Sequence, residues 1–134
     1  MDEMYPNFTL GVVGFSPGFY RQRPAAKALV RAYIRATRDY DNAVTGRSGE
    51  AERTAVDAIF ASHTGLSPAT VRDVVPVGLN PNGLPNRESV TACYSFFREQ
   101  GLIPEPLSDA QLASVWGTDL VDEVLDEIGR VPES

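Results

Sequence analysis

The feature that most constrains this chain is an uninterrupted run of helix-forming residues from Ala25 to Val44. Pro24 stands before the run, where the first turn of a helix tolerates proline, and neither glycine nor proline interrupts it. The run therefore predicts one long helix. Apolar side chains recur along it at helical spacing, which predicts a single stripe facing a core. The stripe contains Leu29, Tyr33, Ala36 and Tyr40, with Val30, Ile34 and Thr37 beside it.

Capping residues and glycines mark the ends of further helices. Serine, threonine or asparagine stands before several helix-forming stretches, and glycine follows most of them. These signals predict helices over residues 50–64, 68–75, 87–100, 108–117 and 119–128. The Asn80–Asn86 segment is dense in turn-forming residues but too short to link two domains. We therefore expect a mainly α chain of about five helices, forming a single domain over residues 1–134.

One short run favours a strand. Residues 8–15 are apolar and β-favouring, and the turn signal Ser16-Pro17-Gly18 follows them. A second short strand is weakly indicated at residues 74–77. A lone strand is unstable without a partner, so one or two short strands suggest that the chain belongs to something larger.

Charge is distributed unevenly along the chain, whose net formal charge is −6. Seven basic residues lie between Arg21 and Arg47, whereas nine acidic residues and only one basic residue, Arg130, lie from Glu99 onward. Such opposed halves neutralise each other, within or between chains, more often than they bind nucleic acid. On the predicted long helix, the basic stripe is expected to be a solvated surface. It contains Lys27, Arg31, Arg35 and Arg38.

No constellation of residues indicates catalysis, so we expect no enzyme activity, catalytic residue, metal or cofactor. His63 is the only histidine and stands at a predicted helix end, where it is expected to interact with the last carbonyl groups. Cys93 is the only cysteine, which excludes an internal disulfide. Glycines at residues 11–18 lack the lysine of a phosphate-binding loop. The carboxylates of residues 119–127 are expected on the outer face of an amphipathic helix.

Residues 50–75 have the length and spacing of a helix-turn-helix, with Gly65 in the turn. Thr70 and Arg72 would lie on the second helix. This segment nevertheless contains four acidic residues against Arg53 and Arg72 alone, whereas DNA binding rests on several basic contacts with phosphates. A DNA-binding regulator is therefore an alternative, with nucleic acid an improbable partner, and a helical interaction module is a third.

Four segments carry a resemblance to a known family. They are residues 19–33, residues 38–40, the run His63-Thr64-Gly65-Leu66-Ser67 and residues 97–103. Their order resembles ABC-transporter substrate-binding proteins of the nitrate, sulfonate, taurine and thiamine-pyrimidine type. The resemblance implies the C-terminal half of such a protein, a fragment of a two-lobed α/β periplasmic-binding-protein type II fold.

The same resemblance implies a function and a location. The chain would be a partial solute-binding component of an ABC importer, with the permease as partner and a small anion, sulfonate or pyrimidine as ligand. Ligand-binding residues in this family come mainly from the part that this chain lacks, so none is assigned and binding by the chain alone is not expected. The family is periplasmic or attached to the cell surface. Residues 1–4 lack the basic start of a secretory signal, which instead predicts a cytoplasmic chain or an excised fragment.

The unpaired strand also predicts self-association. Two copies are expected to pair residues 8–15 across a twofold axis, forming a homodimer. Lys27, Arg31 and Arg35 would then approach acidic residues such as Asp122 and Asp126 of the other copy. Apolar burial in the strand contact is expected to stabilise the dimer more than these exposed ion pairs do.

Overall fold

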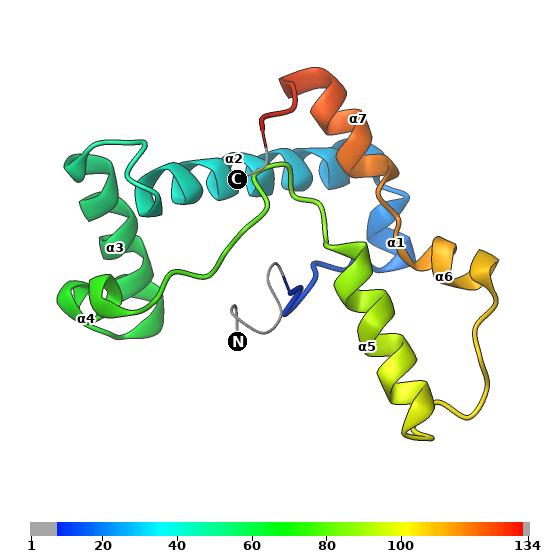
Figure 1. Cartoon of the computed structure of the whole chain (residues 1–134). Helices are drawn as coiled ribbons and strands as arrows, with labels where there is room; N and C mark the ends of the chain where they lie inside the picture. The colour runs from blue at the N-terminus through cyan, green and yellow to red at the C-terminus, as the bar shows by residue number, and fades with distance from the viewer. Residues whose placement is uncertain (1–7, 133–134) are drawn as a thin grey trace.

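The computed structural model describes residues 8–132, which are mainly α-helical, and no strand occurs within this range (Figure 1). The helices are α1 (Pro17–Tyr20), α2 (Arg23–Val44), α3 (Glu50–Thr64), α4 (Pro68–Asp73), α5 (Arg87–Glu99), α6 (Asp109–Val115) and α7 (Asp119–Ile128).

The long helix α2 organises the molecule. Helices α1 and α7 pack near its N-terminal end, and α3 with α4 forms a lobe near its C-terminal end, whereas α5 and α6 extend to one side (Figure 1). The core is small and lies between α2 and α7. Burying one large aliphatic side chain stabilises a fold by about 1.5–3 kcal/mol, so this contact is the main apolar support of the fold. The core residues are Ala26, Val30, Ile34, Leu120, Val124 and Leu125.

The buried side of α2 differs from the predicted stripe. Val30, Ile34 and Thr37 are buried as expected, but Leu29 is 46% exposed and Tyr33 is 41% exposed. The apolar face of α2 is wider than the part of it that α7 and the loop before α5 cover. The sequence therefore predicted the apolar face correctly but did not show which half of it is buried.

The predicted strands are wrong. Residues 8–15 are irregular, and the Thr9 amide donates a hydrogen bond of 3.0 Å to the Ser89 hydroxyl at the start of α5. The Asn86 amide in turn donates to Thr9 Oγ1 over 3.0 Å. Residues 74–77 are also irregular and exposed. Since neither run has a strand to pair with among the described residues, the Ser89 hydroxyl and the Asn86 amide bind the first segment instead.

Most predicted helix ends are confirmed, and local chemistry explains them. Gly65 ends α3 with a φ of 74°, a left-handed conformation that glycine adopts without steric cost, and the Ser67 hydroxyl accepts from the Thr70 amide at the start of α4. Helix α1 was not predicted. Ser16 caps it by accepting from the Phe19 amide, so the expected turn at residues 16–18 is the first turn of a helix.

The loop before α5 fastens the C-terminal segment to α2. Asn82 is buried, and its side chain exchanges two hydrogen bonds with the Val131 backbone, of 2.8 and 3.0 Å. Arg38 donates to the carbonyl oxygens of Pro81 and Gly129 over 3.0 and 2.7 Å. Arg38 is therefore a structural bridge, which corrects the expectation that it is merely solvated.

Candidate functional site

A network of ion pairs joins α2 to α7. Lys27 Nζ lies 3.3 Å from Glu123 Oε2 and 2.5 Å from Glu127 Oε1. Arg31 also pairs with Glu127, and Arg23 pairs with Glu123. Lys27 and Arg31 of the basic stripe are thus paired with α7, whereas Arg35 is exposed as expected. Part of the opposed charge of the two halves is therefore paired within one chain.

These contacts shift the pKa values of the acidic groups on α7. A hydrogen bond from the Tyr20 hydroxyl, aided by Arg23, lowers the pKa of Asp119 below its usual 3.8. Hydrogen bonds from Lys27 and then Arg31 lower the pKa of Glu127 below its usual 4.5. Both carboxylates are therefore held charged as structural partners, whereas a general acid would need a raised pKa.

A buried carboxylate lies between α3 and α4. Asp57 Oδ1 accepts from Arg53 Nε over 2.9 Å, and Asp57 Oδ2 accepts from Arg72 Nε over 2.7 Å. Burial acts to raise the pKa of Asp57, but the hydrogen bonds from Arg72 and Arg53 outweigh it, so this pKa lies below its usual value. Glu50 is a further partner of Arg72. The cluster fixes α4 against α3.

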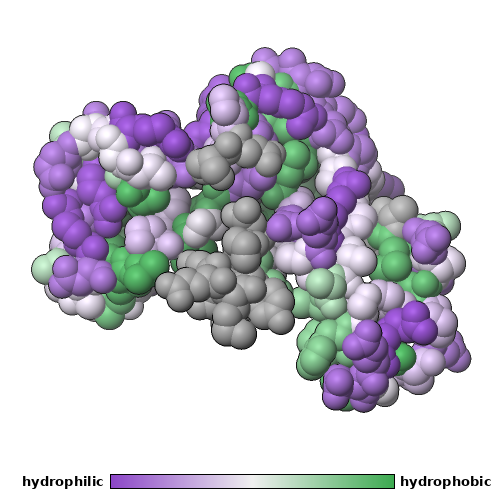
Figure 2. Space-filling view, viewed as in Figure 1, coloured by the Kyte–Doolittle hydropathy of each residue, from purple (hydrophilic) through white to green (hydrophobic). Residues whose placement is uncertain are grey.

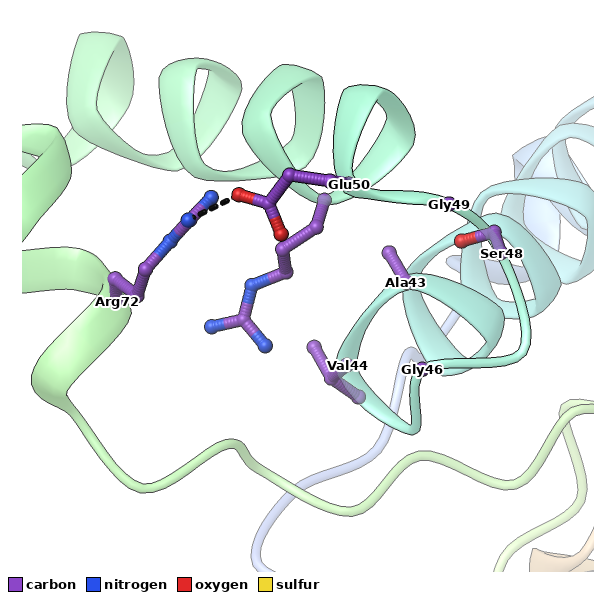
Figure 3. A pocket seen from close by; sticks show the side chains of 8 residues that line it. Ala43, Val44, Gly46, Ser48, Gly49, Glu50 and Arg72 are labelled. Carbon is purple, nitrogen blue, oxygen red and sulfur yellow. Dashed lines mark hydrogen bonds and ion pairs between the residues drawn. The ribbon is translucent and has the colours of Figure 1, made fainter.

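An open hollow of about 300 Å³ lies beside this cluster, between the end of α2 and the start of α3 (Figure 3). The pair of Glu50 and Arg72 spans one side of it, and Val44 lines the opposite side (Figure 3). The Ser48 hydroxyl is buried and has no hydrogen-bond partner among the described residues, so no base is bound to it. The hollow thus lacks an activated nucleophile, and its charges are paired with one another.

The candidate helix-turn-helix is formed in outline, because α3 and α4 are joined by a tight turn at Gly65. Both basic residues of the segment are paired with acidic side chains. Arg53 and Arg72 each bind Asp57, and Arg72 also binds Glu50. Contacts with DNA phosphates would compete with these ion pairs.

The other residues considered from the sequence do not converge on one site. His63 Nδ1 lies 2.9 Å from the Ile59 carbonyl oxygen one turn earlier, an interaction within the end of α3. Cys93 is half-buried on α5. Within residues 8–132, no group of three histidine, cysteine or acidic side chains is placed to hold a metal ion. No helix of the same range is long and apolar enough to cross a bilayer.

An arm formed by α5 and the segment up to α6 carries exposed apolar side chains, and the sequence analysis did not single it out. Helix α5 has no buried residue and packs against no other described helix. Its partly covered side shows helical spacing at Val90, Cys93 and Tyr94, a signal that was available in the sequence. Phe96, Phe97 and Leu102 are exposed, by 55%, 44% and 68%.

No protein-family model, curated protein or solved structure matches this chain.

Proposed function

We propose that this chain is a helical protein–protein interaction module. The observation that carries the proposal is its large surface. The chain exposes 9368 Å², whereas a compact monomer of the same mass, 14.6 kDa, exposes about 6,900 Å². The excess is about 2,500 Å², and α5 and α6 contribute to it because neither packs against another described helix. Extra surface of this kind is typical of chains that complete their packing with another polypeptide.

The nature of the exposed side chains supports the proposal. Figure 2 shows apolar surface over the lobe of α3 and α4 and over the arm of α5 and α6, in both cases beside hydrophilic surface. The arm exposes Phe96 and Phe97, whose rings contact each other edge to face with centroids 5.7 Å apart. Aromatic side chains dominate the energetics of many interfaces, and an arm with no helix against it is open to a partner.

The proposal is tested by site-specific photo-crosslinking in cells that produce the chain. A photoreactive phenylalanine analogue at Phe96 should give a discrete crosslinked product, because a partner covers this side chain. The matched control is Thr91, which is exposed on the polar side of the same helix. Products at both positions, or at neither, would contradict a specific interface at the arm.

The resemblance to solute-binding proteins favours a second candidate, a partial component of an ABC importer. In that case the helical chain would be a fragment of a two-lobed α/β fold and would meet a permease outside the cytoplasm. The supporting observation is the order of the four sequence segments. Calorimetry with taurine, nitrate and hydroxymethylpyrimidine separates the two candidates. An interaction module should give no binding heat, and micromolar binding of any of them would favour the importer component.

A further inference from the structure

We propose that α7 exchanges between copies of this chain, so that α7 of one copy packs on α2 of another and the reverse contact closes a dimer. The surface involved is the docking face, the side of α2 that α7 covers in this structure (Figure 1). This inference goes beyond the interaction proposed for the arm and does not depend on it. The docking face contains Ala26, Val30 and Ile34 in the core and Arg23, Lys27 and Arg31 beside them.

Charge on the docking face is matched step by step by charge on α7. Its three basic residues recur every four residues, and three acidic residues recur at the same interval along α7. Residue numbers rise together in three of the ion pairs, so the two helices run in the same direction in one register. Among the described helices only α7 carries three acidic residues at this spacing, so α7 of a second copy fits the same position. The three pairs are Arg23–Asp119, Lys27–Glu123 and Arg31–Glu127.

The terminal unit, residues 119–131, binds to one part of the chain. Its helix α7 packs against α2 and against no other described helix. Beyond α7, Arg38 binds the Gly129 carbonyl oxygen, and Asn82 exchanges two hydrogen bonds with the Val131 backbone. These partners all precede the arm in the sequence. The same part of a second copy therefore offers every one of these contacts, and exchange neither adds nor removes one.

The arm of α5 and α6 connects that part of the chain to the terminal unit, and it can open. Neither helix packs against another described helix. The two ends of the arm meet where Arg87 donates to Thr118 Oγ1 over 3.1 Å. Farther out, the Leu107 amide donates to the Tyr94 hydroxyl over 2.7 Å. Both hydrogen bonds are exposed, so opening the arm breaks few contacts and no helix packing among the described residues.

The opened arm is long enough to reach a second copy. Helix α5 has 13 residues and spans about 20 Å, and residues 100–108 extend to about 30 Å. Helix α2, with 22 residues, spans about 33 Å, so the opened arm exceeds the length of the helix that carries the docking face. Because the same contacts form within one chain or between two, concentration decides between them. A flexible tether gives α7 an effective concentration on the order of 1 mM at its own docking face.

The experiment mixes two variants with complementary defects. One carries Lys27→Glu and Arg31→Glu on the docking face. The other carries Glu123→Lys and Glu127→Lys on α7. Each variant alone opposes like charges between its own helices, so its α7 amides should exchange hydrogen at least about 10-fold faster than in the parent. In the mixture each docking face meets an α7 of opposite charge on the other chain. Light scattering should show a 1:1 heterodimer, with a dissociation constant about 10- to 100-fold below that of the parent dimer, and α7 protection should return.

The matched control carries all four substitutions in one chain. Its α2 and α7 attract each other within that chain, so its α7 protection and its self-association should match those of the parent. The parent itself tests the dependence on concentration. Refolding it from urea at about 1 mM should give a mixture of monomer and dimer, whereas refolding at about 10 μM should give monomer only.

A mixture without heterodimer, beside a control that folds like the parent, would overturn the inference. So would a single variant that dimerises as tightly as the mixture, because its contact would not be exchange of α7. A control that fails to recover α7 protection, or a parent that is monomeric after refolding at 1 mM, would count against it equally. Crosslinking at Phe96 concerns the arm and does not depend on these results, so the two proposals fail separately.

Discussion

At the scale of single residues, Asp57 is the most informative position. Replacing it with asparagine keeps the shape but removes the charge that Arg53 and Arg72 bind. Because Asp57 is buried, we expect Asp57→Asn to lower the free energy of unfolding by about 1–3 kcal/mol, measured by urea denaturation. Asp73→Asn, at an exposed position at the end of α4, should change it by less than about 0.5 kcal/mol. Equal effects would show that the buried cluster does not hold α3 and α4 together.

His63 should matter little. Its ring interacts with the Ile59 carbonyl at the exposed end of α3, an ordinary helix-end contact. We expect His63→Ala to reduce the free energy of unfolding by at most about 1 kcal/mol and to leave the crosslinked product at Phe96 unchanged. Urea denaturation and the crosslinking experiment, done on the same variant, measure both quantities. A crosslinked product lost in a fully folded His63→Ala variant would assign this residue a role in binding.

At the scale of elements, α7 should detach from α2 in acid. The lowered pKa values of Asp119 and Glu127 mean that the folded state binds protons less readily than the unfolded chain does. Their stabilisation is therefore fully present above the ordinary values of 3.8 and 4.5, and it is lost as the pH falls through the lowered values.

Hydrogen exchange along α7 measures this detachment, at a series of pH values and with rates corrected for intrinsic exchange. Protection of α7 amides should be constant from about pH 7 to 5 and should fall below about pH 4. Glu127→Gln should make protection less dependent on pH in this range. Protection that rises as the pH falls would contradict the network, because these carboxylates would then be destabilising.

Apolar burial is the other support of α7. Leu125 is fully buried against α2, and its truncation leaves a cavity that the small core cannot refill. Leu125→Ala should therefore lower the free energy of unfolding by about 2–5 kcal/mol in urea denaturation. Leu102→Ala, at an exposed position beyond α5, is the control and should have little effect. A small loss at Leu125 would mean that α7 is not part of the cooperative core.

The sequence predicted helices well because their ends are local. Gly65 and the caps at Ser67 and Asn86 act within a few residues of themselves, so their effect can be recognised without knowing the fold. The prediction of a strand at residues 8–15 was wrong because a strand depends on a distant partner, and this segment binds Ser89 instead. The exposure of Leu29 could not be predicted either, since it depends on where α7 lies. The α5 arm was missed although its spacing was visible, because nothing local shows whether an apolar face is covered.

At the scale of the whole molecule, the open arrangement itself is a prediction about solution behaviour. A compact domain of 134 residues has a radius of gyration of about 14 Å. Here α3 with α4 lies at one end of α2, and α5 extends from the other (Figure 1). The radius of gyration of a single copy should therefore exceed about 14 Å by several ångströms, because mass lies far from the centre of α2.

Small-angle scattering of the purified chain measures this radius. Extrapolation to zero concentration removes any residual association, and urea-unfolded chain gives the upper reference. A value near 14 Å for the folded monomer would mean that the α5 arm folds back and covers its own apolar residues. In that case the excess surface would not exist in solution, and the case for a helical interaction module would fail at its first step.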